Sequence, residues 1–241
     1  MAVHYRSQGF VIKKIDRGEA NQLFAIYTKE FGKLEILGKA IRKIKSKLRS
    51  GIELFYLSEI EFIQGKTSKT LTDAILIESF TGIRKNLKKL AIAHKISENL
   101  DDLVKGQEPD KAIWQLLVET FENLDKPKIK NLKPEIIYYY FLWNLFSILG
   151  YQPELYCCAR CQKKLVPSIF YFSLDLGGTV CRQCVEEPKA SQAVSQDLIK
   201  VLRLLTNKDW PVLSRLRIED NVRKLLKKTS DNYLDEILGK N

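Results

Sequence analysis

The stretch GFVIKKIDRGEANQLFAIYTKEFGKLEIL, from Gly9 to Leu37, decides the fold of this chain. It holds three short runs rich in β-branched and aromatic residues, and the last run alternates apolar and polar residues cleanly. Gly18 and Gly32 lie in the breaks between the runs, where turns are expected. We therefore predict three strands, at Gly9–Lys14, Asn21–Thr28 and Lys33–Leu37.

Two further strands are predicted downstream, at Leu54–Ile63 and Leu71–Glu78, with Gly65 in the turn between them. Five short antiparallel strands within about 75 residues are typical of a small closed or partly open barrel. The spacing of the strands does not distinguish an OB barrel from an SH3-like barrel. The first 80 residues are therefore predicted to form a β-barrel domain.

Beyond residue 80, the spacing of apolar residues becomes helical. Residues 151–190 interrupt this pattern with a short stretch rich in Cys and Gly that has little periodicity. The predicted fold class is α+β, with a barrel at 1–80 and an all-α domain at 81–241 that carries a compact insert at about 151–190. The predicted helices run from about Thr81 to Leu103, Lys111 to Leu124, Pro134 to Leu149, Ser195 to Leu205 and Glu219 to Leu238.

The composition is basic, with 40 Lys and Arg against 29 Asp and Glu, a net charge of +11. A basic chain favours an anionic partner, such as nucleic acid, an acidic protein segment or lipid headgroups. The most apolar run, Ile136–Tyr151, contains Asn144 and Ser147. It is shorter than the roughly 20 apolar residues of a membrane span, so we interpret it as a buried helix and expect no membrane association.

Four of the five cysteines form two CxxC pairs, Cys158 with Cys161 and Cys181 with Cys184, separated by nineteen residues. Two such turns facing each other give the four sulfurs that Zn²⁺ prefers, and four thiolates leave no position for a substrate. We predict one structural zinc ion per chain. Cys157 leaves the identity of the first ligand open. A redox role for the pairs lacks the surrounding βαβ pattern.

The N-terminal residues contain no apolar core of a secretory signal. An odd number of cysteines without such a signal indicates a reducing compartment, where thiols stay free or bind metal. We therefore expect a cytoplasmic protein.

A strongly basic segment, which we call the basic loop, spans residues 38–49 between the third and fourth predicted strands. It contains six cations and no acid. A flexible cationic loop beside a barrel can follow a phosphate backbone, which makes these cations the candidate DNA contacts. The alternative is a solvated surface helix with an apolar stripe of Ile41, Ile44 and Leu48. The six cations are Lys39, Arg42, Lys43, Lys45, Lys47 and Arg49.

Strand aromatics near this loop have two interpretations. Phe10, Phe24, Tyr27 and Phe31 either offer stacking platforms for bases or form part of the barrel core. The core interpretation is favoured for each of them, because most strand aromatics are buried.

A second cationic cluster lies at the start of the first predicted helix, where positive charge opposes the helix dipole. This misplacement indicates an external anion, so the cluster is a candidate contact for DNA or a protein partner. Its members are Arg84, Lys85, Lys88 and Lys89. A third cluster, Arg223–Lys228 on the last predicted helix, is interpreted as a solvated face.

Motifs of common enzymes are absent from the sequence. HExxH, GxSxG and GxxxxGK[ST] do not occur, and the two histidines, His4 and His94, lie in different predicted elements. A binding protein is therefore favoured over an enzyme. A metal-dependent nucleic-acid enzyme stays as a third class, to be distinguished by product formation that a chelator abolishes.

Several stretches across nearly the whole chain resemble the RecO family of bacterial recombination-repair proteins. The order of a barrel, a helical domain and a cysteine-containing insert is similar as well, and it implies an OB-type barrel. The stretches are Gly9, Gly18–Ala20, Phe31–Lys33, the basic loop, Glu78–Phe80, Gly150–Tyr151, Gly177–Gly178 and the two CxxC pairs.

This resemblance implies a non-catalytic recombination mediator that acts in the bacterial cytoplasm, associated with the nucleoid. Such a protein binds single- and double-stranded DNA, anneals complementary strands and, with RecR, helps RecA load on strands coated by single-strand-binding protein. It also binds the acidic, apolar tail of that protein, for which we expect an apolar pocket rimmed by Lys or Arg on the helical domain, with Arg84–Lys89 as a first guess. The resemblance makes the basic loop the DNA-contact segment and Cys158, Cys161, Cys181 and Cys184 the zinc ligands.

The alternative function is an OB protein with a zinc ribbon that binds RNA in transcription or translation. Strand preference distinguishes the two: a mediator anneals DNA and recognises the acidic tail, whereas an RNA-binding factor prefers structured RNA and does neither.

Overall fold

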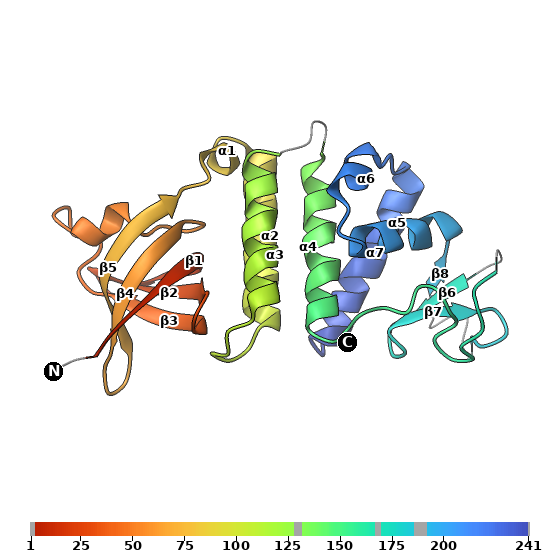
Figure 1. Ribbon diagram of the computed structural model, residues 1–241, viewed down its shortest axis with the longest axis horizontal. Helices are drawn as coiled ribbons and strands as arrows, with labels where there is room; N and C mark the ends of the chain where they lie inside the picture. The colour runs from red at the N-terminus through yellow and green to blue at the C-terminus, as the bar shows by residue number, and fades with distance from the viewer. Residues whose placement is uncertain (1–2, 128–131, 167–169, 186–191, 241) are drawn as a thin grey trace. The chain divides into compact units, whose positions relative to one another are not determined.

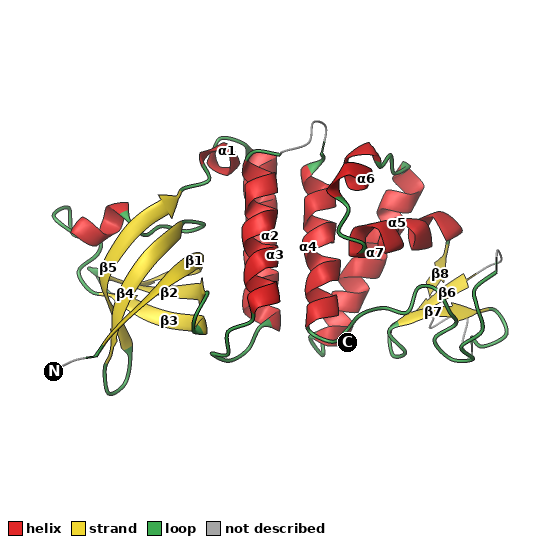
Figure 2. Cartoon of the chain, viewed as in Figure 1, coloured by secondary structure: helices red, strands yellow, loops and turns green. Residues whose placement is uncertain are grey.

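The computed structural model describes residues 3–127, 132–166, 170–185 and 192–240 (Figure 1). The chain divides into two compact units, residues 1–127 and 128–241, which we describe separately. The first unit contains a barrel and three helices, and the second contains four helices and a small sheet (Figure 2). The α+β class predicted from the sequence is confirmed. The domain division at residue 80 remains a prediction, because helices that follow this residue share a compact unit with the barrel.

The barrel is closed by five strands in the order β1-β2-β3-β5-β4, and β4 pairs back onto β1. All neighbouring strands are antiparallel except β3 and β5, where Ile36 pairs with Lys69 in parallel. This topology is that of an OB barrel and settles the choice that strand spacing left open. The strands are β1 (His4–Arg17), β2 (Asn21–Thr28), β3 (Gly32–Gly38), β4 (Leu57–Gln64) and β5 (Lys69–Glu78).

β1 differs from the prediction at both ends, since it runs from His4 to Arg17 rather than from Gly9 to Lys14, and β4 differs most at its start. β1 begins at His4 rather than Gly9, because residues 4–8 pair with β4 from Ile63 to Glu59, with Arg6 exposed and Ser7 buried. β4 begins at Leu57 rather than Leu54, because Phe55 takes a left-handed conformation with φ of 64° and cannot continue a strand. The apolar run therefore includes a turn that periodicity does not show.

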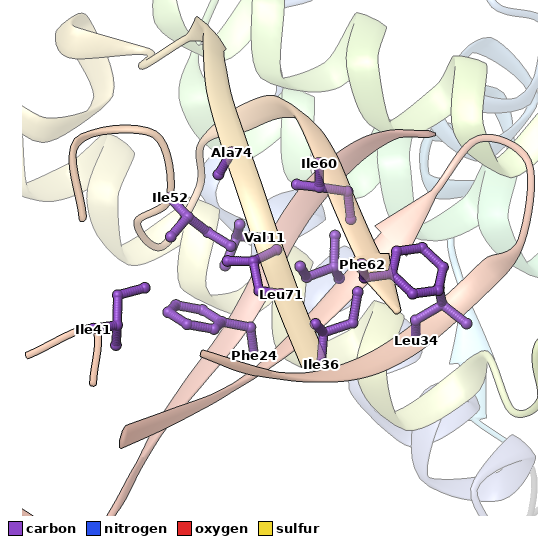
Figure 3. Packing of buried hydrophobic residues seen from close by; sticks show 11 residues of the cluster. Val11, Phe24, Leu34, Ile36, Ile41, Ile52, Ile60, Phe62, Leu71 and Ala74 are labelled. Carbon is purple, nitrogen blue, oxygen red and sulfur yellow. The ribbon is translucent and has the colours of Figure 1, made fainter. Parts of the chain in front are cut away.

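The barrel interior holds one apolar cluster (Figure 3). Gly9 is required beside this cluster, because a Cβ atom there would lie 2.6 Å from Ile26 Cγ2. The aromatic residues Phe24 and Phe62 fill the interior together with aliphatic residues from every strand. The cluster consists of Val11, Phe24, Ile26, Leu34, Ile36, Ile41, Ile52, Ile60, Phe62, Leu71 and Ala74.

Three helices complete the first unit: α1 (Thr81–Arg84), α2 (Leu87–Leu103) and α3 (Lys111–Asp125). An aromatic cluster joins them to the barrel, with ring centroids of Phe10 and Phe121 4.3 Å apart. Phe80 and Phe55 also pack on Phe121, at 5.7 and 5.9 Å. Burial of four aromatic rings makes this contact a second core of the unit.

The prediction of one continuous helix from Thr81 to Leu103 is wrong, because the structure has two helices there, α1 and α2. The helix breaks at Asn86, which is extended and accepts hydrogen bonds from the backbone N–H groups of Lys88 and Lys89. Asn86 is therefore the N-cap of α2. The apolar rhythm continues across the break, so periodicity alone could not reveal it.

The second unit is built around α4 (Pro134–Ile148), which is buried on all sides from Ile136 to Phe146. Trp143 of α4 stacks on Tyr233 with centroids 5.5 Å apart, and its Nε1 donates to Ser230 Oγ at 3.0 Å. The buried-helix interpretation of this apolar run is confirmed. Across the described residues, none of the helices combines the length and apolarity that crossing a membrane requires.

The remaining helices of this unit are α5 (Gln196–Thr206), α6 (Trp210–Arg215) and α7 (Asp220–Ile237). The insert carries a small sheet of β6 (Phe170–Ser173), β7 (Gly178–Cys181) and β8 (Gln192–Val194), in the order β7-β6-β8. The sequence did not predict α6 or this sheet, because elements of three to six residues are too short to show a period. Residues 167–169 and 186–191 of the insert lie outside the described residues.

Candidate metal centre and cationic surfaces

Four sulfur atoms meet at one end of the insert. The Sγ atoms of Cys158, Cys161, Cys181 and Cys184 all lie within 4.8 Å of one another. Cys158 is buried and the other three are partly exposed. The structure therefore brings together the four residues that the two CxxC pairs predict as ligands.

A tight hairpin, the first knuckle (residues 156–165), presents the first pair. The backbone N–H of Cys158 donates to the Lys163 carbonyl at 2.8 Å, and the N–H of Gln162 donates to the Cys158 carbonyl at 2.9 Å. Gln162 closes the turn with a left-handed φ of 58°. The two residues between the cysteines fit within this turn, so both thiols reach the same site.

The second knuckle (residues 180–185) follows from β7. The Cys184 N–H donates to the Cys181 carbonyl at 3.0 Å, which closes its turn. The Cys181 N–H lies 3.4 Å from the sulfur of Cys158, and the Ala159 N–H donates to Thr179 O at 2.8 Å. The first knuckle is therefore joined to β7 and to the second knuckle by backbone N–H donors as well as by the converging sulfurs.

Cys157 does not belong to the group of four sulfurs. Its backbone pairs with Lys164 across the hairpin, and its N–H donates to Glu154 Oε1 at 3.0 Å. Of the two adjacent cysteines, Cys158 is thus the one whose sulfur lies in the group of four, with two residues between it and Cys161.

The donor set fits a metal ion. Four Zn–S bonds of about 2.3 Å in a tetrahedron place the sulfurs roughly 3.8 Å apart, and the observed sulfurs lie within 4.8 Å of one another.

Two of the four thiols have pKa values shifted in opposite directions. Burial raises the pKa of Cys158, but backbone N–H groups of Cys161 and Cys181 outweigh it and lower the pKa to about 6. Hydrogen bonds with the sulfurs of Cys181 and Cys161 raise the pKa of Cys184 to about 12. A cation that takes up the thiolates would replace these protons.

The basic loop is anchored to the barrel at its apolar residues. Ile41 is buried in the barrel cluster and Leu48 packs against it, whereas Ile44 is 95% exposed. The Arg42 N–H donates to the Ala20 carbonyl at 3.0 Å. Only a single 3₁₀ turn, Lys47–Ser50, is helical, so the surface-helix alternative is wrong. Ile41 and Leu48 point inward because they pack against the barrel cluster, not because they form the apolar stripe of a helix.

All six cations of the basic loop are exposed. Arg42 forms an ion pair with Asp16 at 3.3 Å and donates to the Gly18 carbonyl. In the part of the chain that the structure describes, the other five have no carboxylate within 4 Å. Anchored apolar residues and outward cations together give a surface of positive charge beside the barrel.

The strand aromatics belong to the protein interior. Phe10, Phe24 and Tyr27 are fully buried, and Phe31 packs edge-on against Tyr5 and Phe62 at one end of the barrel. The first three are therefore unavailable for stacking on bases, as the favoured core interpretation predicts.

In the cluster at the start of the first predicted helix, two cations bind groups of the protein itself and two are exposed to solvent. Arg84 donates to the Leu54 carbonyl and lies 4.9 Å over the ring of Tyr56. Lys89 donates to the Asp125 carbonyl at 2.7 Å, where it compensates the C-terminal end of α3. Lys85 and Lys88 are exposed. A contact of this cluster with DNA or a partner remains a prediction.

One site was missed by sequence reasoning: residues 101–110 contact β1, β2 and β3 on the outside of the barrel. Asp101 accepts from Lys13 of β1 at 2.8 Å and from Lys33 of β3 at 3.1 Å. Burial raises the pKa of Asp101, but the two lysines outweigh it and hold the pKa below its usual value. No local pattern reveals this, because the partners lie 88 and 68 positions from Asp101.

The same segment is held at two further points. The Tyr27 hydroxyl donates to the Asp110 carbonyl at 3.4 Å, and burial raises the pKa of Tyr27 to about 12. Gly32, with φ of 63°, lies so close to the segment that a Cβ would be 2.4 Å from the Glu108 carbonyl oxygen. OB barrels commonly bind nucleic acid on the face of strands 2 and 3. In this protein the end of that face around Tyr27, Gly32 and Lys33 is contacted by its own chain, whereas Glu35, farther along β3, is exposed.

A small pocket in the second unit has an apolar floor and a charged rim. Ile136 and Tyr139 of α4 and Leu226 of α7 form the floor together with Leu216 and Ile218. Lys133, Glu135 and Arg223 line the rim. The cavity itself is small, about 10 Å³, which is room for about one water molecule, and the rim carries one acid beside two cations.

Comparison with known proteins points to one family. The family described as Recombination protein O N terminal matches residues 1–80, and Recombination protein O C terminal matches residues 84–241. DNA repair protein RecO of Dehalococcoides mccartyi is 33% identical over 218 residues, which cover 90% of this chain and 84% of the relative. RecO of Acetivibrio thermocellus is 30% identical over 238 residues, 99% of this chain and 93% of the relative. RecO of Halalkalibacterium halodurans is 25% identical over 98% of this chain and 90% of the relative.

Proposed function

This chain belongs to the RecO family of DNA repair proteins, and from that premise we propose that it is a non-catalytic recombination mediator of the bacterial cytoplasm, associated with the nucleoid. It binds single- and double-stranded DNA and anneals complementary strands. With RecR it helps RecA load on single strands coated by single-strand-binding protein. The observation that carries this proposal is the anchored basic loop with five cations that have no carboxylate partner within the described residues.

The loop promotes annealing by electrostatics. Lys and Arg side chains neutralise phosphates and release counterions, so affinity falls steeply with salt. When cations contact two strands at once, they lower the repulsion between the strands and allow bases to pair. Since the loop is fixed to the barrel by Ile41 and Leu48, the cations are held outward without a large loss of backbone freedom on binding.

We assign the four-sulfur site to one structural zinc ion per chain. The ligands are Cys158, Cys161, Cys181 and Cys184. A zinc ion bound there supplies cross-linking of the two knuckles and no open coordination position for catalysis. It orders an insert whose own sheet has strands of only three and four residues.

We propose that the tail of single-strand-binding protein docks on the surface over the crevice between α4 and α7. Apolar tail residues lie over the half-buried Leu216 and Ile218, and tail carboxylates meet Lys133 and Arg223. The alternative at Arg84–Lys89 has less support, because Arg84 and Lys89 hold partners within the protein.

Annealing of complementary labelled DNA strands, measured against salt, tests the proposal. A variant with Lys43, Lys45 and Lys47 changed to Glu should lose annealing, because it reverses three loop charges. A matched variant with Lys224, Lys227 and Lys228 changed to Glu carries the same charge change on α7 and should anneal as wild type does. No annealing by folded, metal-loaded wild type, with binding of structured RNA instead, would favour the RNA-binding alternative.

A further inference from the structure

The two knuckles that hold the metal also present a dense cationic surface. Residues 156–165 and 180–185 contain four cations and no acid. Arg160 and Arg182 lie inside the CxxC turns themselves, and Lys163 and Lys164 follow the first turn. All four side chains are exposed.

The fold brings these cations to the same end of the insert. The converging sulfurs fix one knuckle against the other, and Arg160 Nη1 reaches across to the Cys184 carbonyl at 3.4 Å. Lys163 and Lys164 lie on the return side of the first knuckle, where their backbones pair with Cys158 and Cys157. The cations are therefore presented on rigid turns and need little ordering when a ligand binds.

An aromatic ring lies beside this surface. Tyr156, at the start of the first knuckle, is 54% exposed although it is a large hydrophobic residue. Arg203 of α5 lies over its ring with Cζ 4.4 Å from the centroid, and the guanidinium is fixed by a 3.0 Å bond from Nε to the Leu155 carbonyl. The Tyr156 N–H donates to Glu154 Oε1 at 2.7 Å, which fixes the backbone below the ring. A fixed, exposed ring with cations beside it is the arrangement that stacks on a base while the backbone is neutralised.

We propose that the two knuckles form a second nucleic-acid contact, which binds the phosphodiester backbone of single-stranded DNA and stacks a base on Tyr156. The inference rests on the proposed DNA-binding function and adds a site to it. A protein that anneals must hold two strands, and the chain then has one cationic surface in each compact unit. The metal acts here as a scaffold that fixes the turns, not as a ligand for DNA.

Equilibrium binding of a labelled single-stranded oligonucleotide over a range of salt tests this contact. The knuckle variant has Lys163, Lys164 and Arg182 changed to Gln, and the matched control has Lys224, Lys227 and Lys228 changed to Gln. Each lost phosphate contact reduces the steepness of log K against log salt concentration by about 0.7. The slope of the knuckle variant should therefore be about 2 less steep than that of wild type. The control should keep the wild-type slope, and both variants should keep the wild-type metal content.

Tyr156 is tested separately, because stacking does not depend on salt. Tyr156→Ala should weaken binding roughly 5- to 150-fold with the slope unchanged, and Tyr156→Phe should restore the affinity. Equal slopes for the knuckle variant and the control would overturn the inference and leave the loop-based function intact. Unchanged DNA binding with lost binding of an acidic peptide would overturn it in favour of a protein partner. Wild type that binds no DNA at all would overturn the proposed function as well.

Discussion

At the scale of single residues, adjacent cysteines have different roles. Cys158 is a buried member of the four-sulfur group, whereas Cys157 is outside it and is fixed by Glu154. Two neighbours with the same chemistry thus provide a natural test of which thiol holds the metal.

Cys158→Ser should abolish stoichiometric metal binding, and Cys157→Ser should leave it at one ion per chain. A bound structural zinc contributes roughly 10–16 kcal/mol of apparent binding energy, so its loss should unfold the insert. Metal analysis together with limited proteolysis of both variants measures this. Retention of full metal by Cys158→Ser would show that Cys157 can replace it and that the assignment is incorrect.

Asp101 connects three elements through one side chain, because its carboxylate joins β1 and β3 to α2. Its pKa is lower when folded than when unfolded. It therefore contributes stability that is present above its unfolded pKa, about 4, and that is lost as the pH falls through the folded value.

We expect Asp101→Asn to lower the free energy of unfolding at pH 7 by about 1–3 kcal/mol, because Lys13 and Lys33 lose a charged acceptor. The difference from wild type should shrink below about pH 4, where the wild-type carboxylate becomes protonated. Urea unfolding at several pH values measures both effects. Asp175→Asn is the control, since this exposed aspartate has the same charge and lies in the second unit; an equal effect in both variants would contradict a specific role for Asp101.

At the scale of elements, the sequence predicts what has a period and misses what depends on distant contacts. Alternation located five strands, and the 3–4 rhythm located α3, α4, α5 and α7 to within two residues. The break at Asn86 and the turn at Phe55 were missed, because each is set by backbone conformation inside a continuous apolar pattern. The grouping of the four cysteine sulfurs was predictable, because each CxxC turn is a local pattern.

The candidate surfaces show the same division. The six cations of the basic loop were evident from charge alone, but the burial of Ile41 was not, because it depends on the barrel interior. The contact of residues 101–110 with β1, β2 and β3 had no local signal at all. Sequence reasoning therefore identified which residues are charged and left open which surface is accessible.

The anchoring of the basic loop can be measured with two isoleucines of that loop. Ile41→Ala should destabilise the protein by about 2–5 kcal/mol, because it removes a buried side chain from the barrel cluster. Ile44→Ala should change stability by less than about 0.5 kcal/mol, because its side chain is exposed. Denaturant unfolding compares them, and similar values for the two variants would mean that the loop is not packed as described.

At the scale of the whole molecule, the family matches meet between residues 80 and 84, whereas the compact unit extends to residue 127. The aromatic cluster explains the difference, because Phe10, Phe55 and Phe80 of the barrel region pack on Phe121 of α3. A barrel without α3 leaves this apolar surface in water.

A fragment of residues 1–127 should therefore unfold cooperatively, and a fragment of residues 1–80 should aggregate or lack fixed aromatic packing. Near-ultraviolet circular dichroism and denaturant unfolding of both fragments distinguish these outcomes. Cooperative unfolding of the shorter fragment would support the domain boundary predicted at residue 80. Phe121→Ala in the full chain should cost about 3–5 kcal/mol for the same reason.

The contact between Phe10 and Phe121 also forms late during synthesis, because Phe121 is made long after Phe10. The barrel can close only once β5 has been made, at Glu78, and at roughly 5–20 residues per second the 43 residues from there to Phe121 take about 2–9 s to appear. During that interval the growing chain has a barrel whose outer aromatic face lacks its cover. The newborn protein is then most exposed to premature association, because this apolar surface lies in water until α3 is made.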